Sequence, residues 1–367
     1  MTINGISQDE ARRAIEGQNP FPGTRGFAGE IDGALIRDVL GRELIYIETE
    51  PKQGVGRKWA FDPGQLQEPE LVPAGYRYSL TEEEQEQIWN LPNPDPVTER
   101  KTALAQLSTA IETAIADVDP TIPVAFSGGV DSAYLAAATE GPLYVCGFEG
   151  SKDIIAAKKA AATLNRNLKI IELTHEQLRD ATVEVVNAIG RTNTMDVTIA
   201  LPLYLTAKQV ADDGFDQLLL GQGADELFGG YAKVANASND PRVSATTIRE
   251  ARNEVLKTIP DQMERDMRAI KNASVTPICP YLDDRVVSAA LELPEELLIA
   301  DDQRKVGLRQ IAETKLPEEV AYRDKKALQY GSYVSRELDR LARQEGYKRR
   351  IDNHVEKYIR HLISKEN

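Results

Sequence analysis

A short apolar run that breaks into a glycine-rich loop is the feature that most constrains this chain. Residues 124–126 are Val-Ala-Phe, residues 127–132 are Ser-Gly-Gly-Val-Asp-Ser, and an alanine- and leucine-rich stretch follows. The apolar run predicts a buried strand, and the stretch after Ser132 predicts a helix. Two glycines let a backbone approach a ligand closely, and successive N–H groups at a helix N-terminus bind anions. The sequence therefore predicts a strand, a loop and a helix that together hold pyrophosphate.

The residues of this loop, called the Ser127–Ser132 loop below, are the first candidate site residues. Gly128 and Gly129 offer backbone N–H groups, Ser127 and Ser132 offer hydroxyl groups, and the carboxylate of Asp131 suits a magnesium ion. The loop is not a Walker A motif, because no lysine follows the glycines. A Gly-Gly turn by itself is more often only structural. The flanking serine and the Val-Asp-Ser that follows favour a phosphate-binding function.

Composition excludes several classes of protein. The chain has 367 residues and a formal net charge of −14, which disfavours a nucleic-acid partner. We find no apolar run long enough for a transmembrane helix and no signal peptide, so a cytoplasmic protein without membrane contact is expected. Cys146 and Cys279 lie far apart without a C-x-x-C pair, which argues against a disulfide scaffold or a zinc ribbon. Basic residues near the C-terminus alternate with acidic ones and indicate a solvated helix face.

The pattern of apolar runs predicts two domains. Residues 1–95 combine short apolar runs with Pro-Gly turns and are predicted to be a small β-rich domain. The proline-rich segment 91–96 is predicted to be a linker, so the second domain covers residues 96–367. Its predicted strands at 142–148, 168–173 and 217–221 alternate with predicted helices, such as 104–115 and 153–164, and the remainder from about 241 is expected to be mostly helical. This alternation predicts the α/β class, with a parallel sheet covered by helices on both faces and ligands at the carboxyl ends of the strands.

Several segments in order along residues 97–335 resemble the synthetase half of asparagine synthetase and its relatives, including β-lactam synthetase. The Ser127–Ser132 loop resembles the pyrophosphate loop of the ATP pyrophosphatases, which split ATP between its α and β phosphates. The other matching segments are Val145–Asp153, Leu220–Tyr231 (the second signature), Pro280–Asp283, Lys305–Arg309 and Arg323–Lys326. The resemblance implies an ATP pyrophosphatase fold of the adenine nucleotide alpha hydrolase-like type.

The resemblance also implies roles for individual residues. Asp131 and Asp225 match the two carboxylates that hold magnesium in the family, and Lys325 matches a catalytic lysine on the pyrophosphate side. ATP is expected to contact the Ser127–Ser132 loop, the strand end at Cys146 and Gly147, and Gly221 and Gly223 of the second signature. Structural alternatives exist: Asp225 could be a helix N-cap, and Lys325 a surface ammonium beside Lys326.

The chain departs from the family pattern in the region expected to bind the acid. Gln222 stands where the second signature has glutamate, and Leu220 replaces a serine. Glutamine can orient a substrate by hydrogen bonds but cannot act as a general base, so Gln222 is a candidate catalytic residue of altered role. Ala200 and Leu201 stand where asparagine synthetases tend to have hydroxyl residues. An apolar pair there argues against the polar substrate aspartate.

Residues 1–95 resemble only part of a second family domain. The stretch 32–46 is similar to a segment of the glutaminase domain of asparagine synthetases, whose first mature residue is a cysteine nucleophile. No cysteine precedes Cys146 in this chain. We therefore expect a shortened glutaminase-like domain and no hydrolysis of glutamine.

The leading hypothesis is an AMP-forming ligase that uses ATP and magnesium to adenylate a small acid and passes it to ammonia or an amine. Asparagine synthesis from aspartate is the first reaction that we expect, and the expected partners are a second copy of the chain or a separate glutaminase. The same activation could act on another acid or on a tRNA base, although the acidic charge argues against tRNA. A catalytically silent nucleotide-binding relative is the alternative outside the enzymes.

Overall fold

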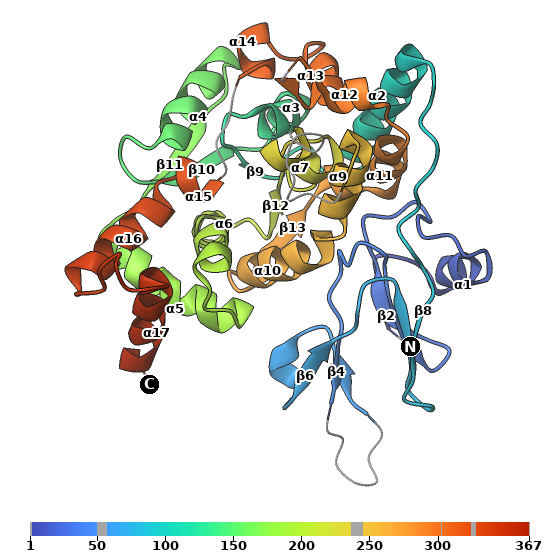
Figure 1. The fold of residues 1–367 in the computed structure, drawn as a ribbon, viewed down its shortest axis with the longest axis horizontal. Helices are drawn as coiled ribbons and strands as arrows, with labels where there is room; N and C mark the ends of the chain where they lie inside the picture. The colour runs from blue at the N-terminus through green and yellow to red at the C-terminus, as the bar shows by residue number, and fades with distance from the viewer. Residues whose placement is uncertain (1, 50–56, 236–244, 302, 324–327, 367) are drawn as a thin grey trace. The chain divides into compact units, whose positions relative to one another are not determined.

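A computed structural model describes residues 2–49, 57–235, 245–301, 303–323 and 328–366 of the chain (Figure 1). It divides into two compact units. Unit 1 comprises residues 1–114, 222–264 and 279–307, and unit 2 comprises residues 115–221, 265–278 and 308–367. Three of the five divisions fall inside helices, namely α2 (Arg100–Ala116), α10 (Ile259–Lys271) and α13 (Val306–Ala312). The domain boundary predicted near residue 95 stays a prediction.

Unit 2 contains a five-stranded sheet in which every pair of neighbours is parallel. The strands are β9 (Val124–Ala125), β10 (Leu143–Gly147), β11 (Leu168–Glu172), β12 (Gln217–Leu219) and β13 (Thr276–Ile278). Their order across the sheet is β11-β10-β9-β12-β13. The chain therefore builds the sheet outward from β9 in one direction and then in the other.

Helices connect these strands and pack on them (Figure 1). The helices that lead from β9 to β12 are α3 (Val130–Ala138), α4 (Lys152–Thr163), α5 (His175–Ile189) and α6 (Thr194–Asp212). The unit ends with α14 (Glu318–Ala321), α15 (Leu328–Gly331), α16 (Val334–Gln344) and α17 (His354–Glu366). The core between β10 and helices α5, α6, α16 and α17 is apolar and includes Cys146, Phe148, Ala200, Leu201 and Tyr358. The predicted α/β class with a parallel sheet is confirmed.

Unit 1 holds antiparallel sheets and the remaining helices. One sheet has the order β1-β2-β3-β7-β8, another has the order β5-β4-β6, and β14 pairs with β15. The strands are β1 (Ile3–Asn4), β2 (Ala28–Ile31), β3 (Ala34–Arg37), β4 (Tyr46–Glu48), β5 (Trp59–Ala60), β6 (Pro69–Leu71), β7 (Tyr76–Ser79), β8 (Gln85–Gln87), β14 (Ile299–Ala300) and β15 (Gln303–Arg304).

The helices that lie wholly within unit 1 are short. They are α1 (Gln8–Glu16), α7 (Ala224–Leu227), α8 (Ala232–Ala235), α9 (Ile248–Leu256), α11 (Asp284–Leu291) and α12 (Glu295–Leu298), with 3-10 turns η1 (Pro63–Gln65) and η2 (Pro280–Leu282). Within the described ranges, no helix combines the length and the apolar character that crossing a bilayer requires.

Most predicted elements of the α/β region match the structure within a residue or two. Strands β10, β11 and β12 and helix α4 lie where the apolar patterns predict them, whereas α2 begins four residues before its predicted start at 104. Strand β13 is the exception within unit 2, because it lies in a region predicted to be mostly helical. It has three residues and is defined by its pairing with β12, a contact that the local sequence does not encode.

A cluster of charges between α16 and α17 predicts a pH dependence of stability. Asp339 accepts hydrogen bonds from Arg349 Nη2 at 2.7 Å, His354 Nε2 at 2.8 Å and Arg343 Nε at 3.0 Å. The Arg349 hydrogen bond is the main reason that the pKa of Asp339 is lowered to about 2. A lowered folded-state pKa stabilises the fold above the pKa of an unfolded aspartate, near 3.9, and this contribution is lost as pH falls towards 2.

We therefore expect Asp339→Asn to lower the free energy of unfolding by about 1 kcal/mol at pH 6, because the partners are partly exposed. Urea unfolding between pH 6 and pH 3 should show the difference from the unmodified chain shrinking below about pH 4. Asp352→Asn, at an exposed aspartate of the same region, is the control. A difference that is the same at pH 3 and pH 6 would contradict the assignment.

Candidate nucleotide-binding site

The Ser127–Ser132 loop of unit 2 lies where the strand order of the parallel sheet reverses. Strands β9 and β12 are neighbours, with Leu219 paired to Val124, and the loop follows the carboxyl end of β9. The residues after β12 lie beside it, since a Cβ atom added to Gly221 would be 3.1 Å from Asp131 Cβ. In open parallel sheets this crevice is where ligands bind.

Close packing makes glycine necessary at one position of the loop. Gly128 has a φ of +69°, in the left-handed region, and a Cβ atom there would lie 2.8 Å from the carbonyl oxygen of Ala156 in α4. Gly129 is the N-cap of α3 and has no side chain with which to cap it. The loop therefore brings bare backbone to the N-terminus of a nine-residue helix.

Two buried hydroxyl groups hold the inside of the loop. Ser132 Oγ accepts a hydrogen bond from the Ser127 N–H at 3.2 Å and donates to the Gly129 carbonyl oxygen at 3.2 Å. The hydroxyl groups of Ser127 and Ser132 are 3.3 Å apart. These contacts join the two ends of the loop, so its conformation is preorganised.

The residues present suit a phosphate group and its magnesium ion. A helix N-terminus with glycine backbone attracts an anion, and Asp131 lies in the first turn of α3. No group of three possible metal-ligating side chains occurs among the described residues. Magnesium in nucleotide sites usually takes one or two carboxylates and completes its shell with phosphate oxygens and water, so a single buried carboxylate at the loop fits that requirement.

The strand end at Cys146 and Gly147, which is predicted to contact ATP, is tightly packed. The side chain of Cys146 is buried in the apolar core of unit 2, and burial raises the pKa of its thiol. At Gly147, an added Cβ atom would lie 2.6 Å from Ser151 Oγ and 3.1 Å from the Ser332 carbonyl oxygen. Any contact with a nucleotide at Cys146 would therefore be through the backbone.

The second signature turns sharply at Gly223, within unit 1. Gly223 is the N-cap of α7, with a φ of +89°, and a Cβ atom there would lie 2.5 Å from a methyl carbon of Leu282. Phe228 packs edge to face on Tyr281, with the ring centroids 5.9 Å apart. The second signature thus rests on the Pro280–Asp283 segment, and both are parts of one packed structure.

Asp225 of the second signature forms an ion pair that the sequence does not predict. Lys305 Nζ lies 2.7 Å from Asp225 Oδ1, and the lysine is buried while the carboxylate is partly exposed. Gly230 makes room for this pair, because a Cβ atom there would lie 2.0 Å from Asp225 Oδ1 and 2.5 Å from Lys305 Cε. Lys305 belongs to the segment Lys305–Arg309 that matches the family pattern, and this match was the only indication in the sequence that Lys305 is functional.

The neighbouring Glu226 is structural. It is buried, and the Tyr231 hydroxyl donates a hydrogen bond to its carboxylate at 2.5 Å. Burial is the main cause that raises the pKa of Glu226, and the nearby charge of Asp225 adds to it. Of the two adjacent carboxylates, Asp225 is therefore the more exposed to solvent.

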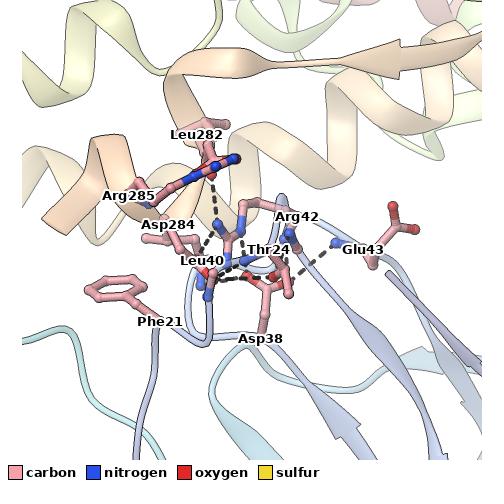
Figure 2. A network of polar contacts seen from close by, with 12 residues as sticks. Phe21, Thr24, Asp38, Leu40, Arg42, Glu43, Leu282, Asp284 and Arg285 are labelled. Atoms are coloured by element: carbon pink, nitrogen blue, oxygen red, sulfur yellow. Dashed lines mark hydrogen bonds and ion pairs between the residues drawn. The ribbon is translucent and has the colours of Figure 1, made fainter. Parts of the chain in front are cut away.

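A buried charge network supports the segment beneath the second signature (Figure 2). Arg42 lies between Asp38 and Asp284, with N–O distances of 2.8 Å and 2.7 Å, and its Nη1 also donates to the Leu282 carbonyl oxygen at 2.6 Å. The N–H groups of Gly23 and Thr24 donate to Asp284 at 3.0 Å and 2.7 Å. The β-rich N-terminal region is thereby bonded to the residues on which Gly223 packs.

The remaining predicted residues have different outcomes. Gln222 is half-buried at the start of the second signature. Lys325 lies outside the described residues. Ala200 and Leu201 are fully buried in α6 among apolar neighbours, so their character reflects the core of unit 2. The argument from this pair against aspartate therefore loses its basis.

One family model matches most of the chain. The model of the family described as asparagine synthase matches residues 104–258 and 240–363. A putative glutamine-hydrolyzing asparagine synthetase of Methanocaldococcus jannaschii is 30% identical over 275 residues, which are 65% of this chain and 51% of that protein. Asparagine synthetase B of Escherichia coli is 25% identical over 261 residues, 65% of this chain and 46% of the relative. The chain thus spans about half the length of the curated relatives that it matches.

Solved structures are more distant. The NH3-dependent NAD synthetase of Campylobacter jejuni aligns with 73% of this chain and 95% of its own, at 13% identity and a TM-score of 0.31. The U34-tRNA thiolase of Methanococcus maripaludis aligns with 72% of this chain and 80% of its own, at 15% identity and a TM-score of 0.29. We draw nothing about function from either likeness.

Proposed function

This chain belongs to the asparagine synthase family, and from that premise we propose that it is an ATP-dependent ligase that joins a small carboxylic acid to ammonia or an amine. We propose aspartate and ammonia as the first pair to test, because the relatives quoted above are named asparagine synthetases. Cleavage of glutamine by this chain is not part of the proposal.

The observation that carries the proposal is the Ser127–Ser132 loop at the reversal of strand order. Left-handed backbone at Gly128, the uncapped N-terminus of α3 and the two bonded hydroxyl groups are features that suit a polyphosphate. The match of the asparagine synthase model includes this loop.

The proposed reaction has two steps. A carboxylate oxygen of the acid attacks the α-phosphorus of ATP, and the bond from this phosphorus to the oxygen bridging to the β-phosphorus breaks. Pyrophosphate leaves and an acyl adenylate remains. Ammonia then attacks the acyl carbon, the bond from that carbon to the phosphate oxygen breaks, and AMP leaves as the nitrogen loses a proton.

In this scheme the residues of the chain bind and orient the triphosphate. The N–H groups at Gly128 and Gly129 and the hydroxyl groups of Ser127 and Ser132 would bind the departing pyrophosphate. Asp131 and Asp225 would hold magnesium, which neutralises the phosphate charge as it shifts during transfer. We propose backbone contacts with the nucleotide at Cys146, Gly147, Gly221 and Gly223, and a contact of Lys325 with pyrophosphate.

The direct test is pyrophosphate release from ATP and magnesium with aspartate and ammonium, each omitted in turn. We expect release to require both substrates and to yield AMP and asparagine in equal amounts. Nucleotide binding without release would leave the ATP site standing and direct the search to other acids. Absence of ATP binding would contradict the proposed function altogether.

Gln222 favours a second candidate, the same activation of a different acid. The amide of Gln222 offers hydrogen bonds but not the negative charge of the glutamate in the family pattern. If the chain is a weakened asparagine synthetase, we expect Gln222→Glu to raise aspartate-dependent turnover by about tenfold or more. Gln262→Glu, at another half-buried glutamine of unit 1, is the control for added charge. No gain for Gln222→Glu would favour another acid.

A further inference from the structure

An arginine from a distant part of unit 2 is bonded to the backbone of the Ser127–Ser132 loop. Arg323 Nη1 donates to the carbonyl oxygen of Gly128 at 3.0 Å, across 195 residues of sequence. The same nitrogen would lie 2.9 Å from a Cβ atom on Gly128, so the guanidinium lies directly against the outer side of this residue. Burial lowers the pKa of Arg323 and the charge of Asp153 opposes that effect. The group is an arginine, so it stays charged.

This bond determines the direction of one peptide group. A trans peptide is planar, and its C=O and N–H point in opposite directions. With the Gly128 carbonyl turned towards Arg323, the N–H of Gly129 is turned to the inside of the loop, where Ser127 Oγ lies 3.5 Å away. That contact is long, so the Gly129 N–H is available to a stronger acceptor such as a phosphate oxygen.

The peptide between two glycines needs such an external constraint. Glycine adopts left-handed and right-handed backbone conformations with similar ease, so the Gly128–Gly129 peptide could rotate and turn its carbonyl inward. An inward carbonyl would repel a phosphate, since both carry negative charge. A hydrogen bond from a charged donor is stronger than one between neutral groups and favours the outward carbonyl.

Arg323 is itself held in place. Arg309 Nη1 donates to the carbonyl oxygen of Ala321 at 2.6 Å and to that of Arg323 at 3.3 Å. Arg309 is buried, so these bonds are shielded from water. Arg309 of α13 therefore holds the backbone at Arg323, and Arg323 in turn holds the Ser127–Ser132 loop.

We propose that Arg323 is a positioning residue, which keeps the Gly128–Gly129 peptide in the orientation that presents the Gly129 N–H to a phosphate group. The role for catalysis rests on the proposed function, whereas the orientation of the peptide does not. Arg323→Met removes the donor and keeps an unbranched side chain. Arg323→Lys, with a shorter cationic side chain, is the second variant should the first fail to fold.

Hydrogen exchange of the free protein tests the orientation without any nucleotide. We expect the amides of residues 127–130 to exchange at least about tenfold faster in Arg323→Met, and to a smaller degree in Arg323→Lys. The matched control is Arg268→Met, which removes a guanidinium that donates to the Ala188 carbonyl oxygen at 2.8 Å elsewhere in unit 2. Unchanged exchange at 127–130 in both Arg323 variants would overturn the proposal.

Binding and kinetics then test the consequence. We expect Arg323→Met to weaken the binding of ATP with magnesium by about tenfold or more and to raise KM for ATP, with KM for the acid unchanged. Weaker ATP binding without faster exchange would mean that Arg323 touches ATP itself, and it would overturn the positioning role. Faster exchange in a chain whose unmodified form binds no ATP would uphold the positioning role and contradict the proposed function.

Discussion

Replacing Asp131 by asparagine is expected to lower pyrophosphate release from ATP by at least about a hundredfold. Asp131 is 4% exposed and lies in the first turn of α3, beside Gly221, which follows the carboxyl end of β12. Asparagine preserves the shape of the side chain but removes the negative charge that would hold magnesium. Steady-state pyrophosphate release at saturating ATP, with the products identified, is the measurement.

Asp119→Asn is the matched control for this variant. Asp119 caps the turn that precedes β9, accepting hydrogen bonds from the Thr121 N–H at 2.8 Å and hydroxyl at 2.7 Å. It therefore lies at the amino end of the strand whose carboxyl end leads into the Ser127–Ser132 loop. Normal turnover in Asp131→Asn would contradict the magnesium site. Equal losses in both variants would point to the fold and not to the metal.

Replacing Arg42 by methionine is expected to lower the free energy of unfolding by about 3–5 kcal/mol. The change removes the charge shared by Asp38 and Asp284 and the donor to the Leu282 carbonyl oxygen (Figure 2). Both carboxylates are almost fully buried and would remain without their cation. Burial raises the pKa of Asp284 and the charge of Arg42 opposes it, so the variant should also raise that pKa further.

Chemical unfolding of the full chain measures this effect, and Arg12→Met is its control. Arg12 forms a two-point contact with Asp32, at 3.0 Å and 2.8 Å, but on the surface of the same unit. Its replacement should change stability little, because exposed ion pairs are screened by water and salt. A similar small effect for Arg42→Met would show that the N-terminal region contributes little to the support of the Leu282 segment.

Much of the parallel sheet and the whole of its loop could be predicted from local sequence. The runs that became β10, β11 and β12 are apolar and bounded by polar or glycine residues, and such patterns act within a few residues. The need for glycine at 128 is also local, because the left-handed conformation that it adopts disfavours most other residues. The family resemblance added the candidate residues Asp131 and Asp225 through their motifs.

The partners of the charged groups were decided by the tertiary structure alone. Arg323 reaches Gly128 across 195 residues, and Arg42 reaches the Leu282 carbonyl across 240. Neither pairing has a local signature, since an arginine in a sequence indicates a charge but not the acceptor that packing brings to it. Local sequence preferences determined where the strands, the turns and the anion-binding loop form. The order of the strands and the packing of distant segments determined which backbone carbonyl each arginine binds.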